Sequence, residues 1–189
     1  RVHPKKGLTN LIEAIAILKE KKAVGLEDWT LVIAGCLEKG KYENELAALI
    51  SKNNLEGSVL LLGQFYHEEK QACYYHANAF ILPSFSEGMP LAALDAWAFG
   101  KYSILTPECN LPDGYEEGIT KRIEANPDSI AQGLRELFLM PESELSELGN
   151  RARDYVSKEY SWTNIAAKMV EMYNWVSGSA PAPASINFS

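Results

Sequence analysis

Residues 79–100 read AFILPSFSEGMPLAALDAWAFG. Four apolar residues, Ala79 to Leu82, predict a short buried strand. A polar turn with the pair Glu87-Gly88 follows, and a helix is predicted from Pro90 to Phe99. Proline in the first turn of a helix costs no hydrogen bond, because the first amides of a helix have no partner within it. Strand, turn and helix in this order form one βα unit of an α/β fold.

The turn of this unit has the chemistry of a site for phosphate and sugar groups. The free amides and the positive end of the helix attract anions and sugar oxygens. Glu87 lies at the mouth of the turn, and Asp95 follows on the helix. Both carboxylates only accept hydrogen bonds, so they suit the hydroxyl groups of a ligand. The segment therefore predicts recognition of an anion and a polyol at one place.

Strands and helices alternate along most of the chain. The predicted strands are apolar almost without interruption, which indicates burial on both faces and hence a parallel sheet covered by helices. We therefore predict an α/β fold with a Rossmann-like, doubly wound parallel sheet. Strands are predicted at residues 29–35, 59–63, 79–82, 102–105 and 119–123, helices at 9–22, 42–53, 67–77, 90–99 and from Asn126-Pro127-Asp128 onward, and a loop at 108–118.

The last part of the chain departs from this alternation. Two added helices without a strand between them are predicted at residues 142–160 and 162–176, and the apolar face of the second is expected to pack on the domain. Residues 178–189 are rich in serine, alanine and proline, which predicts a flexible tail or linker. We therefore expect one domain over residues 1–177.

Composition excludes several classes of function. With 189 residues, of which 47% are hydrophobic, the chain can bury one sizeable core. A net charge of -7 argues against nucleic-acid binding, and no apolar run is long enough to span a membrane. Cys36, Cys73 and Cys109 lack the spacing of a zinc site or a disulfide scaffold, so we expect reduced thiols and a cytoplasmic protein.

Ligands of open α/β sheets bind outside the carboxyl ends of the strands. A basic turn, Lys5-Lys6-Gly7, would join that edge if a further strand precedes Arg1. Arg1 and Lys6 beside helix amides are the cations that a pyrophosphate needs, whereas Lys5 alone is better explained as a solvated side chain. The turns that meet at this edge begin after Gly35, Gly63, Leu82 and Leu105.

The ordered set of these segments resembles the donor-binding, C-terminal half of GT-B retaining glycosyltransferases of family 4, also called glycosyl transferase group 1. The most specific part is EGMPL at 87–91 leading to DAWAFG at 95–100, which is similar to the family's E-x7-E signature. RVHPKKG at 1–7 resembles its R-x-x-x-x-K-G turn. AG at 34–35 with EL at 45–46, LG at 62–63 and ANAFILPS at 77–84 also fit the family pattern.

The resemblance implies a role for each matching residue. Arg1 and Lys6 are expected to hold the donor diphosphate and Glu87 to hold hydroxyls of the donor sugar, so these three are the expected catalytic residues. Asp95 is expected to hold the ribose of the nucleotide. It replaces the family's glutamate and is one methylene shorter, so a bridging water can replace the direct contact. The remaining expected donor-binding residues are Gly35, Gly88, Met89, Pro90 and Leu91.

The reaction that the resemblance implies is transfer of a sugar from a nucleotide diphosphate sugar to an acceptor, with retention at the anomeric carbon. Cations and helix amides would stabilise the leaving diphosphate, without a metal or another cofactor. The expected partners are the nucleotide-sugar donor and a missing N-terminal acceptor domain of the same polypeptide. Any peripheral membrane contact is expected only through that missing half. A chain beginning at Arg1 without methionine is expected to be a fragment, inactive alone.

Other functions remain open at this point. A nucleotide-sugar binding module without turnover would use the same residues, and the change to Asp95 would fit its decay. A GT-B epimerase would share the carboxylate and phosphate sites. A dinucleotide-dependent oxidoreductase would need G-x-G-x-x-G between the first strand and its helix, and the chain has no such run.

Overall fold

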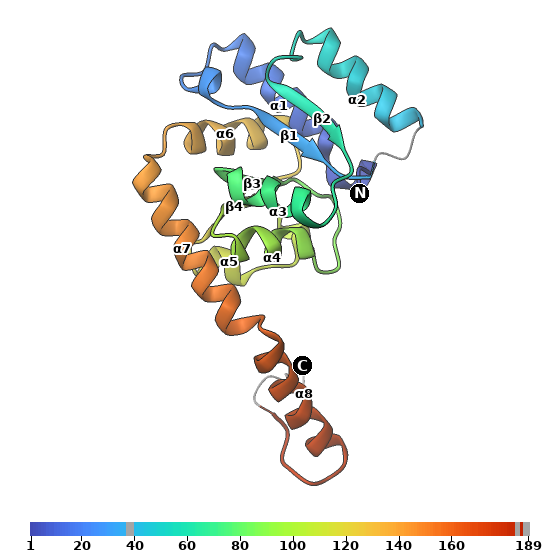
Figure 1. Cartoon of the computed structure of the whole chain (residues 1–189), viewed down its shortest axis with the longest axis vertical. Coiled ribbons are helices and arrows are strands. Elements are labelled where there is room, and N and C mark those ends of the chain that lie inside the picture. The colour runs from blue at the N-terminus through green and yellow to red at the C-terminus, as the bar shows by residue number, and fades with distance from the viewer. Residues whose placement is uncertain (37–39, 184–185, 187–189) are drawn as a thin grey trace.

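The computed structural model describes residues 1–36, 40–183 and 186. Helices and strands alternate through its first two thirds, as predicted (Figure 1). The strands are β1 (Leu31–Ala34), β2 (Val59–Gly63), β3 (Ala79–Leu82), β4 (Tyr102–Leu105) and β5 (Thr120–Arg122). The helices are α1 (Leu8–Glu20), α2 (Lys41–Lys52), α3 (His67–His76), α4 (Leu91–Ala98), α5 (Asp113–Glu116), α6 (Pro127–Phe138), α7 (Glu142–Glu159) and α8 (Trp162–Val176), with 3-10 turns η1 (Pro4–Lys6), η2 (Leu26–Asp28) and η3 (Pro107–Cys109).

All strand pairs in the described residues are parallel, which confirms the predicted sheet type. β1 pairs with β2, and β4 lies between β3 and β5. The strands therefore form two groups, one with two strands and one with three. Helices cover both faces of the larger group, as the doubly wound fold predicts.

The core has a part on each face of β4. On one face, Tyr102 and Ile104 belong to a cluster with the apolar sides of α1 and α6. On the other face, Leu105 packs in a cluster with Trp97 of α4 and with α7. Trp97 is fully buried, and its indole Nε1 donates to the Ser103 hydroxyl at 2.8 Å. A buried tryptophan is stabilised when its N–H has such a partner.

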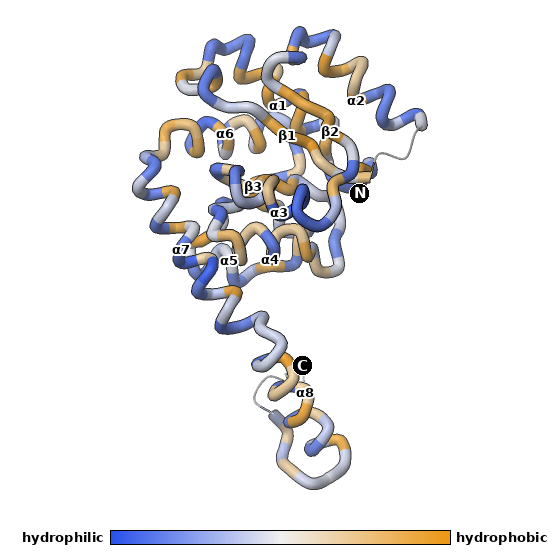
Figure 2. Tube along the Cα trace, viewed as in Figure 1, coloured by the Kyte–Doolittle hydropathy of each residue, from blue (hydrophilic) through white to orange (hydrophobic). Residues whose placement is uncertain are grey.

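The smaller strand group contradicts the prediction that all strands are buried on both faces. Ile33 and Val59 lie in the core against α1 and α2, but Val32, Leu60 and Leu62 are exposed by 37–45%. The apolar stretches at β1 and β2 are orange in Figure 2. The helices that pack on this pair cover one face only. The apolar side chains on the other face therefore stay exposed.

Two local predictions were also wrong. Pro90 precedes α4 as its N-cap residue, with φ −78° and ψ 90°, rather than lying in the first helical turn. The predicted loop at 108–118 contains the end of η3 and the short helix α5. Asn110 ends η3 in the left-handed region, with φ 54°. A short polar side chain tolerates that conformation better than most.

Helix α8 does not pack on the domain, contrary to expectation. None of its residues is buried, and Trp162 is 88% exposed. Figure 1 shows α8 extending from the end of α7, away from the strands. No helix of the described residues has the length and apolarity that crossing a membrane requires. Of the predicted tail, residues 184, 185 and 187–189 lie outside the described residues.

Candidate functional site

The basic turn at the start of the chain lies against the loop that follows β3. Gly7 has φ 67°, a conformation that favours glycine, and a β-carbon there would come within 2.1 Å of the Pro83 carbonyl oxygen. The Phe85 amide also donates to the carbonyl oxygen of Lys5 at 2.8 Å. The side chain of Lys5 is exposed, as predicted. Glycine at position 7 therefore allows Lys6 to reach the loop.

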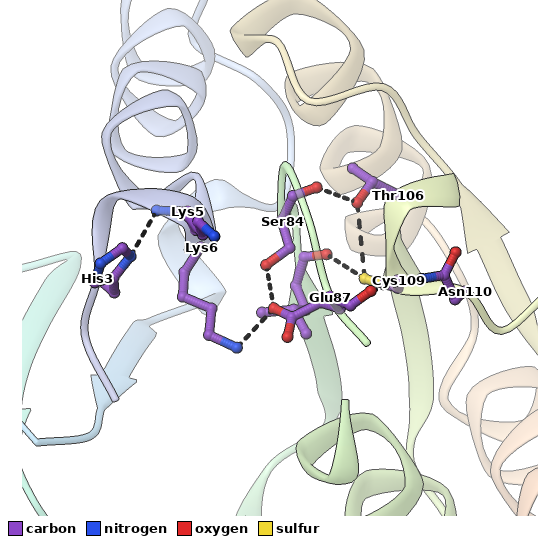
Figure 3. A network of polar contacts seen from close by, with 9 residues as sticks. His3, Lys5, Lys6, Ser84, Glu87, Thr106, Cys109 and Asn110 are labelled. Carbon is purple, nitrogen blue, oxygen red and sulfur yellow. Dashed lines mark hydrogen bonds and ion pairs between the residues drawn. The ribbon is translucent and has the colours of Figure 1, made fainter. Parts of the chain in front are cut away.

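Lys6 and Glu87 form an ion pair across this contact (Figure 3). Lys6 Nζ lies 2.6 Å from Glu87 Oε1, and the two side chains are 27% and 12% exposed. The residues are 81 positions apart in the sequence. The structure thus brings together the residues predicted to bind diphosphate and sugar, at the carboxyl edge of the larger strand group.

Three further contacts hold Glu87. The Ser84 hydroxyl donates to Glu87 Oε1 at 2.5 Å. The backbone amide of Glu87 donates to the Glu108 carbonyl oxygen at 2.9 Å. Asn110 Nδ2 donates to the Glu87 carbonyl oxygen at 2.5 Å. Glu87 is therefore fixed by its own loop after β3 and by the loop after β4. Figure 3 shows Lys6 on one side of Glu87 and Cys109 and Asn110 of the β4 loop on the other.

The segment after Glu87 is open to solvent. A β-carbon on Gly88 would meet no atom within 4 Å. Met89 and Leu91 are 57% and 65% exposed, whereas Pro90 is buried. Within the described residues, no side chain caps the start of α4. Amides at this helix start can therefore face a ligand, although Pro90 contributes no N–H.

Arg1 lies at the end of β1, beside Gly35. A β-carbon on Gly35 would be 3.5 Å from backbone atoms of Arg1. The Val2 amide donates to the Cys36 carbonyl oxygen at 2.9 Å, which continues the alignment past the end of β1. Arg1 and Gly35 thus lie at the end of β1, and Glu87 to Leu91 follow β3, with residues 2–6 connecting the two places.

Asp95, which is expected to bind the ribose, already forms an ion pair within the protein. Its Oδ2 lies 2.7 Å from Nζ of Lys70 in α3, and the two side chains are 39% and 54% exposed. The Lys70 ammonium also lies 5.8 Å from the centre of the Tyr74 ring. Asp95 therefore faces α3 and its cation, and a hydroxyl that binds here meets a carboxylate already paired with Lys70.

Ser84, Asn110 and Lys70 were not predicted as site residues. Ser84 could have been predicted, because it lies in the turn after β3, three residues before Glu87. Asn110 lies in the predicted loop at 108–118, where no motif singled out its side chain. The pairing of Lys70 with Asp95 depends on how α3 and α4 pack, which no local pattern encodes.

The Cys109 thiol of this network is not activated as a nucleophile. Burial, followed by the charge of Glu87, raises the pKa of the Cys109 thiol, although hydrogen bonds from Thr106 and Ser84 oppose the shift. A raised thiol pKa lowers the thiolate fraction. In residues 1–36, 40–183 and 186, no three histidine, cysteine, aspartate or glutamate residues gather as metal ligands.

A separate hollow of about 690 Å³ lies away from these residues. Side chains of α1, the end of α2 and the start of α6 line it, and both signs of charge are represented by Glu13, Lys19, Lys52 and Asp128. None of the predicted donor-binding residues belongs to this hollow.

Comparisons with known proteins agree with the fold and identify the family. The family model described as "Glycosyl transferases group 1" matches residues 1–155. The amylovoran biosynthesis glycosyltransferase AmsK of Erwinia amylovora is 30% identical over 145 residues, which are 74% of this chain and 33% of that protein. The chain spans between a third and a half of the length of the curated relatives it matches.

Solved structures show the same fold at low sequence identity. A glycosyltransferase from Rickettsia africae matches with a TM-score of 0.81 and 19% identity, over 95% of this chain and 47% of that one. HepE of Anabaena, solved in complex with UDP and glucose, matches with a TM-score of 0.75 and 17% identity, over 93% of this chain and 46% of that one.

Proposed function

The chain belongs to the group 1 glycosyl transferases, and we propose that it is the donor-binding half of a retaining hexosyltransferase. The donor is a nucleotide diphosphate sugar, and the acceptor domain belongs to the same polypeptide. The observation that carries this proposal is the ion pair of Lys6 with Glu87, 2.6 Å long, at the carboxyl edge of β3. A cation for phosphate and a carboxylate for hydroxyls are adjacent there, as a sugar phosphate requires.

Each part of the donor then has a place. Lys6 and Arg1 hold the diphosphate, and the accessible amides of Gly88, Met89 and Leu91 assist them. Glu87 accepts hydrogen bonds from the sugar, and Asp95 binds the ribose, directly or through water. The amides at the start of α4 are held by the helix before donor binds, and Lys6 exchanges its contact with Glu87 for one with the diphosphate, so both stabilise charge on the leaving group. We propose that the site works without a metal. We also propose a cytoplasmic location, because we expect the cysteines to be reduced.

We further propose that a strand preceding Arg1 completes the sheet. β1 and β3 each have a strand partner on one edge only within the described residues. The same core cluster contains Ile33 of β1 and Ile104 of β4, so one apolar layer covers both strand groups. The bond from Val2 to Cys36 directs the chain before Val2 alongside β1. A parallel strand there would occupy the position between β1 and β3.

The test of the proposed function is a panel of UDP-, GDP- and ADP-sugars measured by thermal unfolding. A donor that binds only the native state raises the midpoint by about 5 °C or more near saturation for a chain of this size. We expect one nucleotide class to do so, and Arg1→Ala and Glu87→Ala to reduce the rise.

Glu144→Ala, on an exposed part of α7 outside the site, is the matched carboxylate control and should respond as the wild type does. If Arg1→Ala and Glu87→Ala also respond as the wild type does, the assigned site is wrong. If the full-length protein binds donor but releases no free sugar or product, the chain belongs to a binding module instead.

A further inference from the structure

The Glu87 carboxylate uses its two oxygens unequally. Among the described residues, both of its hydrogen-bond donors, Lys6 Nζ at 2.6 Å and Ser84 Oγ at 2.5 Å, contact Oε1. A carboxylate oxygen with two donors has little capacity left for a third. Oε2 therefore remains as the acceptor that a ligand hydroxyl can use. Figure 3 shows Lys6 and Ser84 converging on this side chain from different segments.

Ser84 is itself rigidly placed. It is fully buried two residues after the end of β3, and its carbonyl oxygen accepts a hydrogen bond from Thr106 Oγ1 at 2.6 Å. Thr106 is fully buried as well and follows β4. The hydroxyl of Ser84 must donate to Glu87, because an ionised carboxylate has no hydrogen to give. The ends of two adjacent strands thus fix the rotamer of Glu87 through one hydroxyl.

Lys6 cannot supply this constraint alone once donor is present. Its side chain is more exposed than that of Glu87, 27% against 12%, and a bound diphosphate would compete for the ammonium. When Lys6 turns toward phosphate, Ser84 is the described residue that still holds Oε1. A group kept in its productive orientation before the ligand arrives loses less freedom on binding.

We infer that Ser84 is a positioning residue for the donor sugar: it holds Oε1 of Glu87 so that Oε2 faces the sugar hydroxyls. The inference rests on the proposed function. Ser84 acts on the sugar end of the donor and not on the nucleotide end, because the only hydrogen bond of its hydroxyl in the described residues goes to Glu87. Its removal should therefore weaken binding of the nucleotide sugar and spare binding of the nucleoside diphosphate.

The experiment is titration calorimetry of the 189-residue chain with two matched pairs, UDP-glucose with UDP and GDP-mannose with GDP. In the pair that the wild type binds, Ser84→Ala should lower the affinity for the nucleotide sugar about tenfold or more, the effect of losing one hydrogen bond to a charged group. Affinity for the nucleoside diphosphate should change less than twofold. Ser86→Ala, exposed two residues away, is the matched control and should change neither affinity.

The outcomes separate the two proposals. Equal losses for nucleotide sugar and nucleoside diphosphate in Ser84→Ala would mean a structural role and would overturn this inference while leaving the proposed function intact. No loss for either ligand would overturn it as well. If the wild type binds neither pair, nor any donor of the wider panel, the proposed function itself fails and the inference falls with it.

Discussion

At the residue scale, one glycine sets the position of the predicted phosphate cation. Gly7 combines a left-handed backbone with contact to Pro83, so it allows η1 to lie against the loop that carries Glu87. Any side chain would move the turn away from that loop. The geometry of the Lys6–Glu87 pair therefore depends on a residue without a side chain.

Gly7→Ala should destabilise the chain by about 2 kcal/mol or more. A non-glycine residue in the left-handed region costs about 1–2 kcal/mol, and the β-carbon would also overlap the Pro83 carbonyl oxygen at 2.1 Å. Urea unfolding measures the change in free energy. Gly57→Ala is the control, because a β-carbon there meets no atom within 4 Å, and it should stay within about 0.5 kcal/mol of the wild type. Equal stability of Gly7→Ala and wild type would contradict this reading of the turn.

Part of the candidate site could be predicted from sequence at this scale. Lys6 and Glu87 were predicted to share a site, because the basic turn and the βα turn both belong to the carboxyl edge of a parallel sheet. The structure brings the two side chains together. The pairing of Asp95 with Lys70 could not be predicted, because it depends on the packing of α3 against α4. The hydrogen bond from Asn110 to the Glu87 carbonyl oxygen could not be predicted either, because it depends on the left-handed backbone of Asn110 at the end of η3. The binding roles of all these residues remain predictions.

At the element scale, helix α7 packs closely on the turn between α4 and β4. Gly149 lies inside α7, where a β-carbon would come within 2.0 Å of the Gly100 carbonyl oxygen. Gly100 has φ 67°, so the turn itself needs a glycine. Two glycines therefore let the helix backbone approach the turn, and α7 covers the face of the sheet opposite α1 and α6.

Gly149→Ala should lower the free energy of unfolding by about 1–3 kcal/mol, as overpacking does in tight sites. Helix propensity alone predicts the opposite sign, a gain of about 1 kcal/mol from replacing glycine by alanine inside a helix. Thermal or urea unfolding decides which effect wins. Ser157→Ala, on the exposed side of the same helix, should be neutral or slightly stabilising. A Gly149→Ala variant more stable than the wild type would show that α7 does not pack closely here.

Most elements could be predicted from periodicity, but their partners could not. The strand β4 and the helix α8 are examples. β4 reads as an apolar run and is fully buried, because helices cover both of its faces. α8 has an apolar side as well, yet none of its residues is buried. Amphipathic spacing predicts that a helix forms, whereas burial depends on which surface is present to receive it.

At the scale of the whole molecule, the division of the sheet is the main feature that needs an explanation. The two groups of strands share one apolar layer. In the described residues, one edge of β1 and one edge of β3 have no strand partner. The proposed strand before Arg1 would pair with both edges. It would also anchor Arg1 at the end of a central strand, where a cation can face the donor diphosphate.

Extending the chain at its N-terminus by the residues that precede Arg1 in the full-length protein should therefore raise stability. A gain of 1 kcal/mol corresponds to about 2–4 °C in melting temperature at this size, and pairing two strand edges should give at least that. Extension at the N-terminus by an equal number of glycine and serine residues is the control and should have no comparable effect. An unchanged melting temperature after N-terminal extension would contradict the proposed central strand.

A nucleotide sugar is expected to bind at the carboxyl edge, between Lys6 and the start of α4. The most direct test is a titration followed by amide chemical shifts in two-dimensional NMR, using the donor that stabilises the chain most in the thermal panel. We expect the largest amide shifts on residues of the carboxyl edge, namely Lys6, Gly35, Ser84, Glu87, Gly88, Met89 and Leu91. Shifts centred instead on the hollow beside Glu13, Lys52 and Asp128, with the carboxyl edge unchanged, would contradict this expectation.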